Sequence, residues 1–381
     1  MNEIHQNINI NNKINNNCNQ NNLDSNSDYS FSNYKKAITT GLKLQGDTSY
    51  FNSVLYALSN IRNIVSYFLN PKNKKYINDR ISSMPVSFVF ERLLIHLYPY
   101  PEKAYKEIYE PNSFFKVIGK LNSEFNTFTK KNPNDLIVYI INTLHKELNQ
   151  MSDNSFKINF NLNNKKNLIK EKIKYFKNYE NSIISNNLNW FEIKECQCTQ
   201  CNNKIYDLIS YNTFSLDIQK SYQFIKNNKN NSNNYLTIYD CLEFYRNKKR
   251  EEFKCNNCNN KEMDNIQKIF SSPNNFVFLM DRREILDDIN KLLEIPFHLD
   301  DKIDLNNFIE NDNVPKEYEL IVVVSFCIKE KKYVSYCRSP VDKMWYFYKD
   351  EFNKKVDIEE EINRHNNYKE FIPYILIYKS K

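Results

Sequence analysis

Two pairs of cysteines are the clearest chemical signal in this sequence. Cys198-x-x-Cys201 and Cys255-x-x-Cys258 each place two thiols at the spacing of a metal-binding knuckle. Four thiolates can bind one tetrahedral Zn²⁺ ion, and such a site is structural because it leaves no open coordination position. Cys196, two residues before the first pair, leaves the register of that pair open. The sequence therefore predicts a structural zinc site, against the alternative of four unrelated reduced cysteines.

Two helices are expected in the part of the chain that precedes these cysteines. In the segment 49–69, apolar residues recur at helical spacing: Val54, Leu55, Leu58, Ile61, Val65, Phe68 and Leu69. A second helix is expected over 132–148, because Asn132 can cap it and Pro133 suits its first turn. One apolar face of this helix is formed by Leu136, Ile140, Leu144 and Leu148.

After residue 270 the pattern changes to short runs of β-branched and aromatic residues. These runs are NFVFLM, YELIVVVSFCI, KKYVSYCR, MWYFY and PYILIY. Runs of this kind predict the strands of an antiparallel sheet. Because helices come first and strands later, the order of elements favours the α+β class.

Composition narrows the classes of function. The chain has 381 residues, a net charge of +7 and 41% hydrophobic residues, enough for a substantial core. The basic residues are spread along the chain, so we predict no nucleic acid partner. No apolar run reaches the roughly 18 residues of a membrane span, and the N-terminus lacks a signal-peptide pattern. We therefore expect an intracellular protein, cytoplasmic or nuclear, with no membrane partner and with reduced cysteines.

Two polar tracts interrupt the pattern of a folded domain. Residues 1–36 are rich in asparagine and have little to bury, so we expect a disordered tail. The tract KNNKNNSNN, residues 226–234, is expected to be a surface loop within residues 37–381.

Several stretches together resemble the ubiquitin-specific proteases, which are papain-like cysteine deubiquitinases. GLKLQGDTSYFNSVLYAL (41–58) is similar to the cysteine box of that family, and NPNDLIVYIINTLHKEL (132–148) to its second, acidic helix box. The cysteine pairs resemble its zinc ribbon, and the later strand segments follow in family order. The resemblance implies an α+β fold of thumb (about 41–150), fingers (about 190–265) and palm (mainly 270–380) in a domain spanning 37–381.

The resemblance also identifies the positions that carry the family's chemistry. Ser49 occupies the position of the nucleophilic cysteine, and Lys332 that of the histidine base. The position of the acid or amide that orients the base falls on Lys349, with Asp350 beside it. The oxyanion-stabilising asparagine is replaced by Leu44.

These substitutions predict an inactive homologue of the deubiquitinases. A hydroxyl is far less acidic than a thiol, so Ser49 needs a strong neighbouring base to act as a nucleophile. Loss of one oxyanion donor alone costs about a hundredfold or more in rate. The alternative is an active deubiquitinase with a Ser49–Lys332 dyad, in which the lysine would have to be desolvated to act as a base. The run from Glu330 to Lys332 instead has the pattern of a solvated, charged turn.

Ubiquitin binding can survive the loss of chemistry. In the family, acids at the start of the second helix box contact an arginine of the extended ubiquitin tail. Asn132 replaces the first acid, while Asp135 retains a carboxylate at the second, where it also suits the helix N-terminus. Lys331 replaces a glycine beside the narrow channel for the tail, where a long side chain obstructs passage.

Three functional hypotheses follow from the resemblance. The first is an inactive pseudo-deubiquitinase that binds ubiquitin or a ubiquitinated partner. The second is a scaffold within a protein complex that makes no contact with ubiquitin. The third is an active deubiquitinase with altered chemistry. A divergent α+β domain with chance motif fragments is the plainest alternative to all three.

Overall fold

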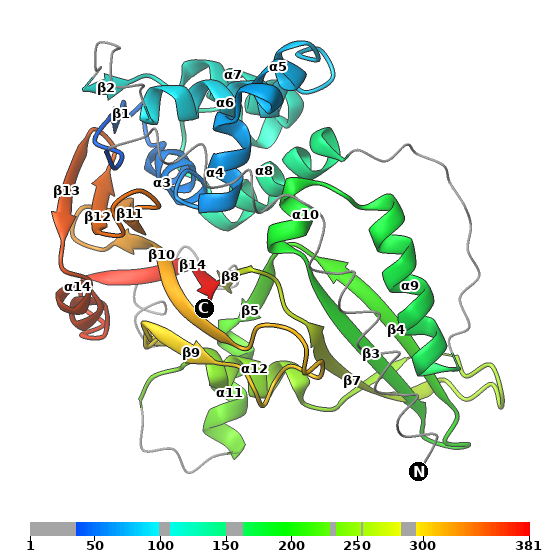
Figure 1. Ribbon diagram of the computed structural model, residues 1–381. Helices are drawn as coiled ribbons and strands as arrows, with labels where there is room; N and C mark the ends of the chain where they lie inside the picture. The colour runs from blue at the N-terminus through cyan, green and yellow to red at the C-terminus, as the bar shows by residue number, and fades with distance from the viewer. Residues whose placement is uncertain (1–35, 99–106, 150–162, 229–233, 253, 283–294) are drawn as a thin grey trace.

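The computed structural model describes residues 36–98, 107–149, 163–228, 234–252, 254–282 and 295–381. The predicted disordered tail, residues 1–36, lies outside the described residues except for its last position. In Figure 1, helices from the N-terminal part of the chain lie above a twisted sheet, and a second sheet projects to the lower right. We call these parts the helical lobe, the central sheet and the projecting sheet.

The helical lobe contains the first predicted helix, which the structure divides in two. The helices of the lobe are α3 (Ser49–Leu58), α4 (Arg62–Leu69), α5 (Pro71–Asn78), α6 (Pro85–Leu97), α7 (Asn112–Leu121), the 3₁₀ turn η1 (Ser123–Phe125), α8 (Pro133–Leu148) and α10 (Ile183–Leu188). The break after α3 occurs where the Asn60 amide donates a 2.8 Å hydrogen bond to the Tyr56 carbonyl. Asparagine side chains compete in this way with helical backbone bonds, so the apolar periodicity continues through a turn that is not helical.

The second predicted helix is confirmed. Asn132 caps α8, because its side-chain oxygen accepts a 3.0 Å hydrogen bond from the backbone N–H of Asn134. The four apolar residues predicted to form one face are all buried. The amide of Asn134 also donates to the Met280 carbonyl at 2.9 Å, which ties the start of α8 to the central sheet.

The central sheet contains all five strands predicted after residue 270. Its order is β13-β12-β11-β10-β14-β8-β5, and β9 pairs with β10. Its strands are β5 (Phe214–Asp217), β8 (Asn275–Asp281), β9 (Lys302–Asp304), β10 (Glu317–Cys327), β11 (Lys332–Arg338), β12 (Trp345–Lys349), β13 (Phe352–Val356) and β14 (Phe371–Ser380). The pairing is antiparallel except between β5 and β8, which run parallel. The chain reaches β8 from β5 through two helices and two strands of the projecting sheet rather than a tight turn, and this long connection permits parallel pairing.

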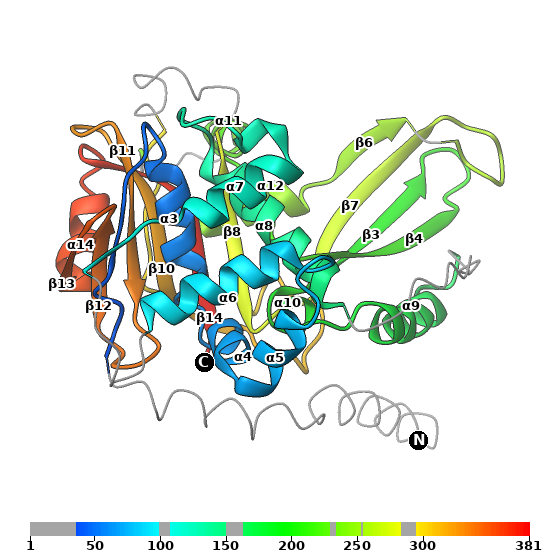
Figure 2. The ribbon, with the colours of Figure 1, turned by 90° about the horizontal axis from the view of Figure 1, so that it is seen from above.

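The projecting sheet is antiparallel, with the order β4-β3-β7-β6. Its strands are β3 (Trp190–Cys198), β4 (Lys204–Tyr211), β6 (Lys249–Glu252) and β7 (Glu262–Ser271). Helix α9 (Lys165–Tyr179) packs against β4, and Figure 2 shows it beside the projecting sheet. The expected surface loop at 226–234 begins as the end of α11 (Ile218–Asn228), and residues 229–233 lie outside the described part.

The remaining elements join these parts. They are β1 (Gly41–Leu42), β2 (Ile108–Tyr109), α12 (Ile238–Arg246) and α14 (Ile358–His365). Helix α3 lies directly against β11, and all ten of its residues are buried. None of the helices in the described residues is both long and apolar enough to cross a membrane.

Candidate functional site

The four predicted cysteines lie together at the tip of the projecting sheet. Their Sγ atoms all lie within 4.8 Å of one another, with Cys198 and Cys258 at 3.5 Å and Cys201 and Cys255 at 3.6 Å. Cys196 lies outside this cluster, and its sulfur faces the Asn265 side chain at 3.8 Å. The register of the first pair that the sequence left open is therefore Cys198 with Cys201.

The two cysteine knuckles share one backbone geometry. Asn202 and Asn259, each directly after the second cysteine of its pair, have positive φ angles of 58° and 59°. Asparagine tolerates this left-handed conformation better than most residues. The N–H of each asparagine donates to the carbonyl of the first cysteine, at 3.1 Å for Cys198 and 2.9 Å for Cys255. The asparagine after each Cys-x-x-Cys was a signal in the sequence for this matched turn.

The electrostatics of the first knuckle favour thiolates, whereas in the second knuckle, against a backbone hydrogen bond from Asn260, burial and the neighbouring thiols raise the pKa of Cys258 to about 12. Backbone N–H groups, first that of Cys201, lower the pKa of Cys198 to about 6. The pKa of Cys201 is also lowered, mainly by a hydrogen bond from Asn257. Zn²⁺ binds deprotonated cysteines, so four converging thiols with a lowered pKa at one pair fit a tetrahedral zinc site. The cluster can hold a metal ion, and the chemistry of its donors matches structural zinc.

The predicted nucleophile position lies at the start of α3, between the helical lobe and the central sheet. Ser49 is 1% exposed, and its Oγ accepts a 3.1 Å hydrogen bond from the backbone N–H of Tyr333 on β11. Thr48, the residue before the helix, donates from Oγ1 to the Gln45 carbonyl and does not cap α3. The first turn of α3 carries no acidic side chain. The positive end of the helix dipole is therefore directed at Ser49.

Lys332 faces Asp350 rather than solvent alone. Its Nζ lies 3.4 Å from Oδ2 of Asp350, and the lysine side chain is 36% exposed while the aspartate is 6% exposed. Asn52, one turn along α3 from Ser49, donates to Oδ1 of Asp350 at 2.9 Å. Burial raises the pKa of Asp350 above its usual value, against the hydrogen bond from Asn52 and the charge of Lys332.

The side chain of Lys349 points to a different partner from that of the next residue, Asp350. Its ammonium donates to both carboxylate oxygens of Glu330, at 3.1 and 2.9 Å. Leu44, at the predicted oxyanion position, is half-buried and has no polar side-chain atom to donate. The structure thus brings Ser49, Lys332 and Asp350 together at one place, which we call the Ser49 site. The Lys349 side chain instead pairs with the turn that follows β10.

The two histidines that flank the predicted base position are engaged elsewhere. The Nδ1 atom of His298 lies 3.1 Å from the hydroxyl of Tyr368. His365 is buried, with Nε2 at 2.9 Å from the Ser325 hydroxyl and Nδ1 at 2.7 Å from the Glu361 carbonyl. Burial lowers the pKa of His365 to about 4. Its bonding and its low pKa suit a structural histidine.

Asp135 lies in the first turn of α8, where sequence reasoning placed it. The side chain is half-buried, and the acid is the one acidic residue of that turn. Its position suits the helix dipole. The same position lies next to Asn132, so a role in binding and a role in helix stability remain compatible with its placement.

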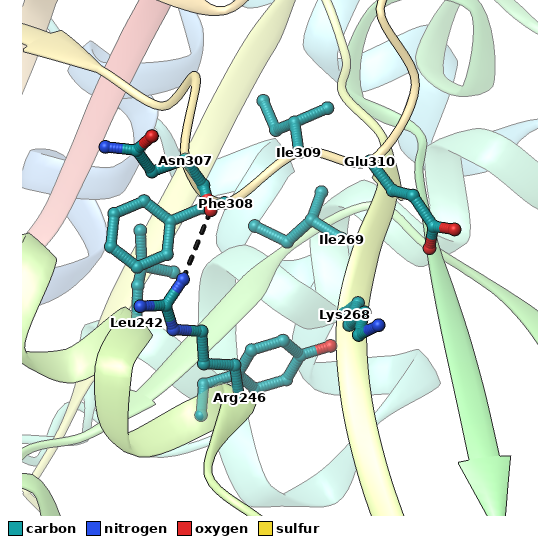
Figure 3. Close-up of a pocket in the computed structure, with 9 residues that line it drawn as sticks. Leu242, Arg246, Lys268, Ile269, Asn307, Phe308, Ile309 and Glu310 are labelled. Atoms are coloured by element: carbon teal, nitrogen blue, oxygen red, sulfur yellow. Dashed lines mark hydrogen bonds between the residues drawn. The ribbon is translucent and has the colours of Figure 1, made fainter.

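A separate pocket of about 280 Å³ lies between the projecting sheet and α12. Figure 3 shows Ile269 and Phe308 in this pocket, with the charged ends of Lys268 and Glu310 toward one side. Arg246 donates from Nη1 to the Asn307 carbonyl at 3.2 Å, and its guanidinium lies 4.9 Å from the Phe308 ring centroid. None of the residues that line this pocket belongs to the Ser49 site or to the cysteine cluster, and the sequence analysis did not predict a role for them.

Comparison with known proteins agrees with this architecture. The family profile described as "Ubiquitin carboxyl-terminal hydrolase" matches residues 40–378. Ubiquitin carboxyl-terminal hydrolase 4 of Saccharomyces cerevisiae is 23% identical over 304 residues, which cover 74% of this chain and 31% of the yeast protein. A protein of the same description from Vanderwaltozyma polyspora is 27% identical over 124 residues, covering 30% of this chain and 14% of that protein. The chain therefore spans less than a third of the length of these relatives.

Two solved structures share the fold. One is the SAGA DUB module with Ubp8, Sgf11, Sus1 and Sgf73 bound to monoubiquitin, with a TM-score of 0.62 and 18% identity. The alignment covers 90% of this chain and 69% of that chain. The other is the same module bound to ubiquitin aldehyde, also with a TM-score of 0.62 and 18% identity, covering 91% and 70%. The α+β fold with a helical lobe, a central sheet and a cysteine-bearing projecting sheet is thus that of the ubiquitin-specific proteases.

Proposed function

We propose that this chain, which belongs to the ubiquitin carboxyl-terminal hydrolase family, binds ubiquitin or a ubiquitinated protein without hydrolysing it. The observation that carries the proposal is the ion pair between Lys332 and Asp350 beside the buried hydroxyl of Ser49. The chemistry of the family needs a thiolate next to an imidazole, and Ser49 and Lys332 provide neither group.

Ser49 is a poor nucleophile in this setting. Its Oγ accepts a hydrogen bond from Tyr333, and a backbone N–H cannot remove the hydroxyl proton. A serine needs an adjacent base, because the helix dipole alone cannot lower the pKa of a hydroxyl into the useful range. Leu44 supplies no side-chain donor for a developing oxyanion.

The Ser49–Lys332 dyad is disfavoured by the same ion pair. A lysine acts as a base only when its neutral form is favoured, which requires burial away from compensating charge. The carboxylate of Asp350 favours the charged ammonium, and more than a third of the Lys332 side chain is exposed. We therefore expect no turnover from a Ser49–Lys332 dyad, and a turnover assay tests this expectation.

Binding is supported by what the fold retains. The structural neighbours include a complex described as bound to monoubiquitin, and this chain aligns to it over 90% of its length. We infer that thumb, palm and fingers correspond to the helical lobe, the central sheet and the projecting sheet, with the boundaries expected from the sequence. We also infer that Zn²⁺ at the four cysteines holds the tip of the projecting sheet, and that Asp135 contacts the ubiquitin tail.

A scaffold without ubiquitin contact is the second candidate. The same neighbours are described as modules in which Ubp8 is assembled with Sgf11, Sus1 and Sgf73, so this fold can serve as one subunit of a complex. A chain that has lost its chemistry and its tail contact could retain that role alone. Ubiquitin affinity separates this candidate from the first.

The test is isothermal titration of the full chain with mono-ubiquitin, together with an assay on a fluorogenic ubiquitin substrate. We expect saturable binding and no turnover above that of the Ser49→Ala variant. Absence of binding up to high micromolar ubiquitin would leave the scaffold as the better account. Turnover that disappears in Ser49→Ala would establish the active alternative and overturn the proposal.

A further inference from the structure

Two lysine-bearing turns meet beside Ser49, one from the helical lobe and one from the central sheet. The turn at 127–131 precedes α8, and the segment 328–332 comprises the turn that joins β10 to β11 and the first residue of β11. Their sequences, TFTKK and IKEKK, contain five lysines and one acid. We call the surface formed by these two turns the lysine seam.

Direct contacts hold the two turns together. The ammonium of Lys130 lies 3.9 Å from the ring centroid of Phe326 and 5.7 Å from that of Tyr333, the residues at the base of the second turn. The Phe128 carbonyl accepts a 2.8 Å hydrogen bond from the backbone N–H of Asp47, just before α3. Both turns therefore converge on the start of α3, where Ser49 lies.

The charges on the lysine seam are not balanced within it. Glu330, the single acid on the two turns, bonds Lys349 through both oxygens. Lys332 pairs with Asp350. The other four lysines of the seam are Lys130, Lys131, Lys329 and Lys331, of which three are exposed and Lys131 is half-buried. Asp47 and Asp135 lie on the adjoining segments, before α3 and in the first turn of α8, while the two turns themselves carry more lysines than acids.

The backbone adds charge of the same sign. Helix α8 begins at Pro133, directly after the first turn, and α3 begins at Ser49. Helix α8 therefore begins close to the seam along the chain, and α3 begins close to it through the hydrogen bond between Asp47 and Phe128. The N-terminal end of a helix carries the positive end of its dipole. Like charges brought together in this way raise the affinity of a surface for an anion that can lie between them.

The surface also offers an apolar contact. Phe128 on the first turn is 51% exposed and stacks on Phe115 with ring centroids 4.5 Å apart. One exposed ring does not make the track of stacking platforms on which single-stranded nucleic acids are bound. A polypeptide with acidic residues and one apolar side chain matches the observed mixture of lysines and a single exposed ring.

We propose that the lysine seam binds an extended acidic polypeptide segment with an apolar residue that covers Phe128. This proposal rests on the proposed function, since it names the kind of sequence that a bound partner would present at the Ser49 site.

The test is fluorescence anisotropy of the full chain with short labelled peptides. One peptide is rich in glutamate and aspartate with a central leucine, and the second replaces every acid by its amide. We expect saturable binding of the acidic peptide, weakening as salt increases, and binding of the amide peptide at least tenfold weaker, on the order of one or two lost charge contacts. Equal binding of the two peptides overturns the proposal.

Charge reversal locates the site. We expect the double variant Lys130→Glu/Lys331→Glu to weaken the acidic peptide by at least about fivefold. The matched control is Lys170→Glu/Lys174→Glu on the exposed face of α9, which makes the same change in net charge away from the seam. An equal loss in the control, or tighter binding of single-stranded oligothymidylate than of the acidic peptide, would show non-specific polyanion binding and reject the seam.

Mono-ubiquitin titration on the same variants keeps this proposal separate from the proposed function. Ubiquitin binding without peptide binding rejects the seam alone. Peptide binding at the seam without ubiquitin binding rejects the ubiquitin reader and leaves the seam as a site for another partner. The midpoint temperature of thermal unfolding is measured for each variant. A midpoint equal to that of the wild type shows that a loss of binding is not caused by a loss of fold.

Discussion

The ammonium of Lys332 lies 3.4 Å from Oδ2 of Asp350, so a salt bridge forms at the position where the resemblance to the family predicts the base. Asp350 is also tied to α3 and β1: its carboxylate accepts from Asn52, and its carbonyl accepts from the Leu42 N–H and the Tyr56 hydroxyl, both at 2.9 Å. Asp350 thus joins the central sheet to α3 and β1.

Restoring the family side chains tests whether this site lost only its chemistry. We expect Ser49→Cys/Lys332→His to hydrolyse a fluorogenic ubiquitin substrate, since a histidine at 332 would lie beside the carboxylate of Asp350 already held by Asn52. The rate should stay about 10²–10³-fold below that of a complete site, because Leu44 provides no oxyanion donor. Single-turnover assays measure the rate.

Controls separate this result from a trace of contaminating protease. The single variant Ser49→Cys should be inactive because it lacks a base, and adding Asp350→Ala to the double variant should remove the gained activity. Adding Leu44→Asn should raise it. A double variant that binds ubiquitin yet shows no turnover even with Leu44→Asn would contradict the view that Asp350 can orient a base here.

The four-cysteine cluster gives a second prediction. Purified without chelator, the chain should contain about one zinc ion, and Cys255→Ser should lose it because three thiolates bind Zn²⁺ far more weakly than four. The thermal midpoint should fall, since structural zinc contributes directly to folding. Metal analysis and thermal unfolding are the measurements.

Cys196 provides the matched control for that experiment. It lies two residues from Cys198 on β3 but its sulfur faces Asn265. We expect Cys196→Ser to retain the metal. Full zinc content in Cys255→Ser, or equal loss in Cys196→Ser, would contradict the assignment of the ligands.

Local sequence signals predicted the elements well where one segment determines its own structure. Asn132, Pro133 and the apolar face of 132–148 are local signals from which α8 could be predicted. The cysteine spacing likewise predicted the cluster at the tip of the projecting sheet. By contrast, the end of α3 depends on a side-chain bond from Asn60, and the parallel pairing of β5 depends on a distant strand.

The Ser49 site depends on tertiary contacts that no spacing reveals. Counting along the chain pointed to Lys349 as the third member, but the turn after β12 places the Asp350 side chain toward Lys332 and Lys349 toward Glu330. The backbone of Asp350 adopts a positive φ of 50°, a conformation that redirects its side chain relative to the strand. Sequence reasoning described Lys332 as part of a solvated turn, whereas its ammonium is engaged by a buried carboxylate.

The buried histidine gives a prediction for pH. Burial lowers the pKa of His365 from its ordinary value of 6.5 to about 4, so between these values the unfolded chain binds more protons than the folded chain. Stability is therefore retained above pH 6.5 and falls as the pH decreases toward 4, by about 1.4 kcal/mol for each unit of pKa shift. Urea unfolding at a series of pH values measures this slope.

His365→Gln should reduce the slope, because glutamine keeps polar atoms for Ser325 and Glu361 but does not titrate. The comparison is His96→Gln on α6, where the histidine is exposed and stacks on Tyr109, and its slope should change less than that of His365→Gln. Identical slopes for His365→Gln and the wild type would mean that His365 does not govern the acid sensitivity.

Gly41 allows the contact between β1 and the turn that carries Asp350. A Cβ atom on this residue would lie 2.3 Å from the carbonyl oxygen of Glu351 and 2.7 Å from its Cα, distances that backbone atoms cannot tolerate. The next residue, Leu42, donates its N–H to the Asp350 carbonyl at 2.9 Å, so β1 cannot move away without losing that bond. We expect Gly41→Ala to destabilise the chain by about 1–3 kcal/mol, the usual cost of forcing an added carbon into packed structure. Thermal and urea unfolding measure the change in the free energy of unfolding. The control variant Lys43→Ala, at an exposed ion pair with Glu110, should cost far less.

Because the strain acts on the Asp350 turn, Gly41→Ala introduced into Ser49→Cys/Lys332→His should also lower the restored activity. An unchanged unfolding midpoint would contradict the role of Gly41 in holding this turn against β1.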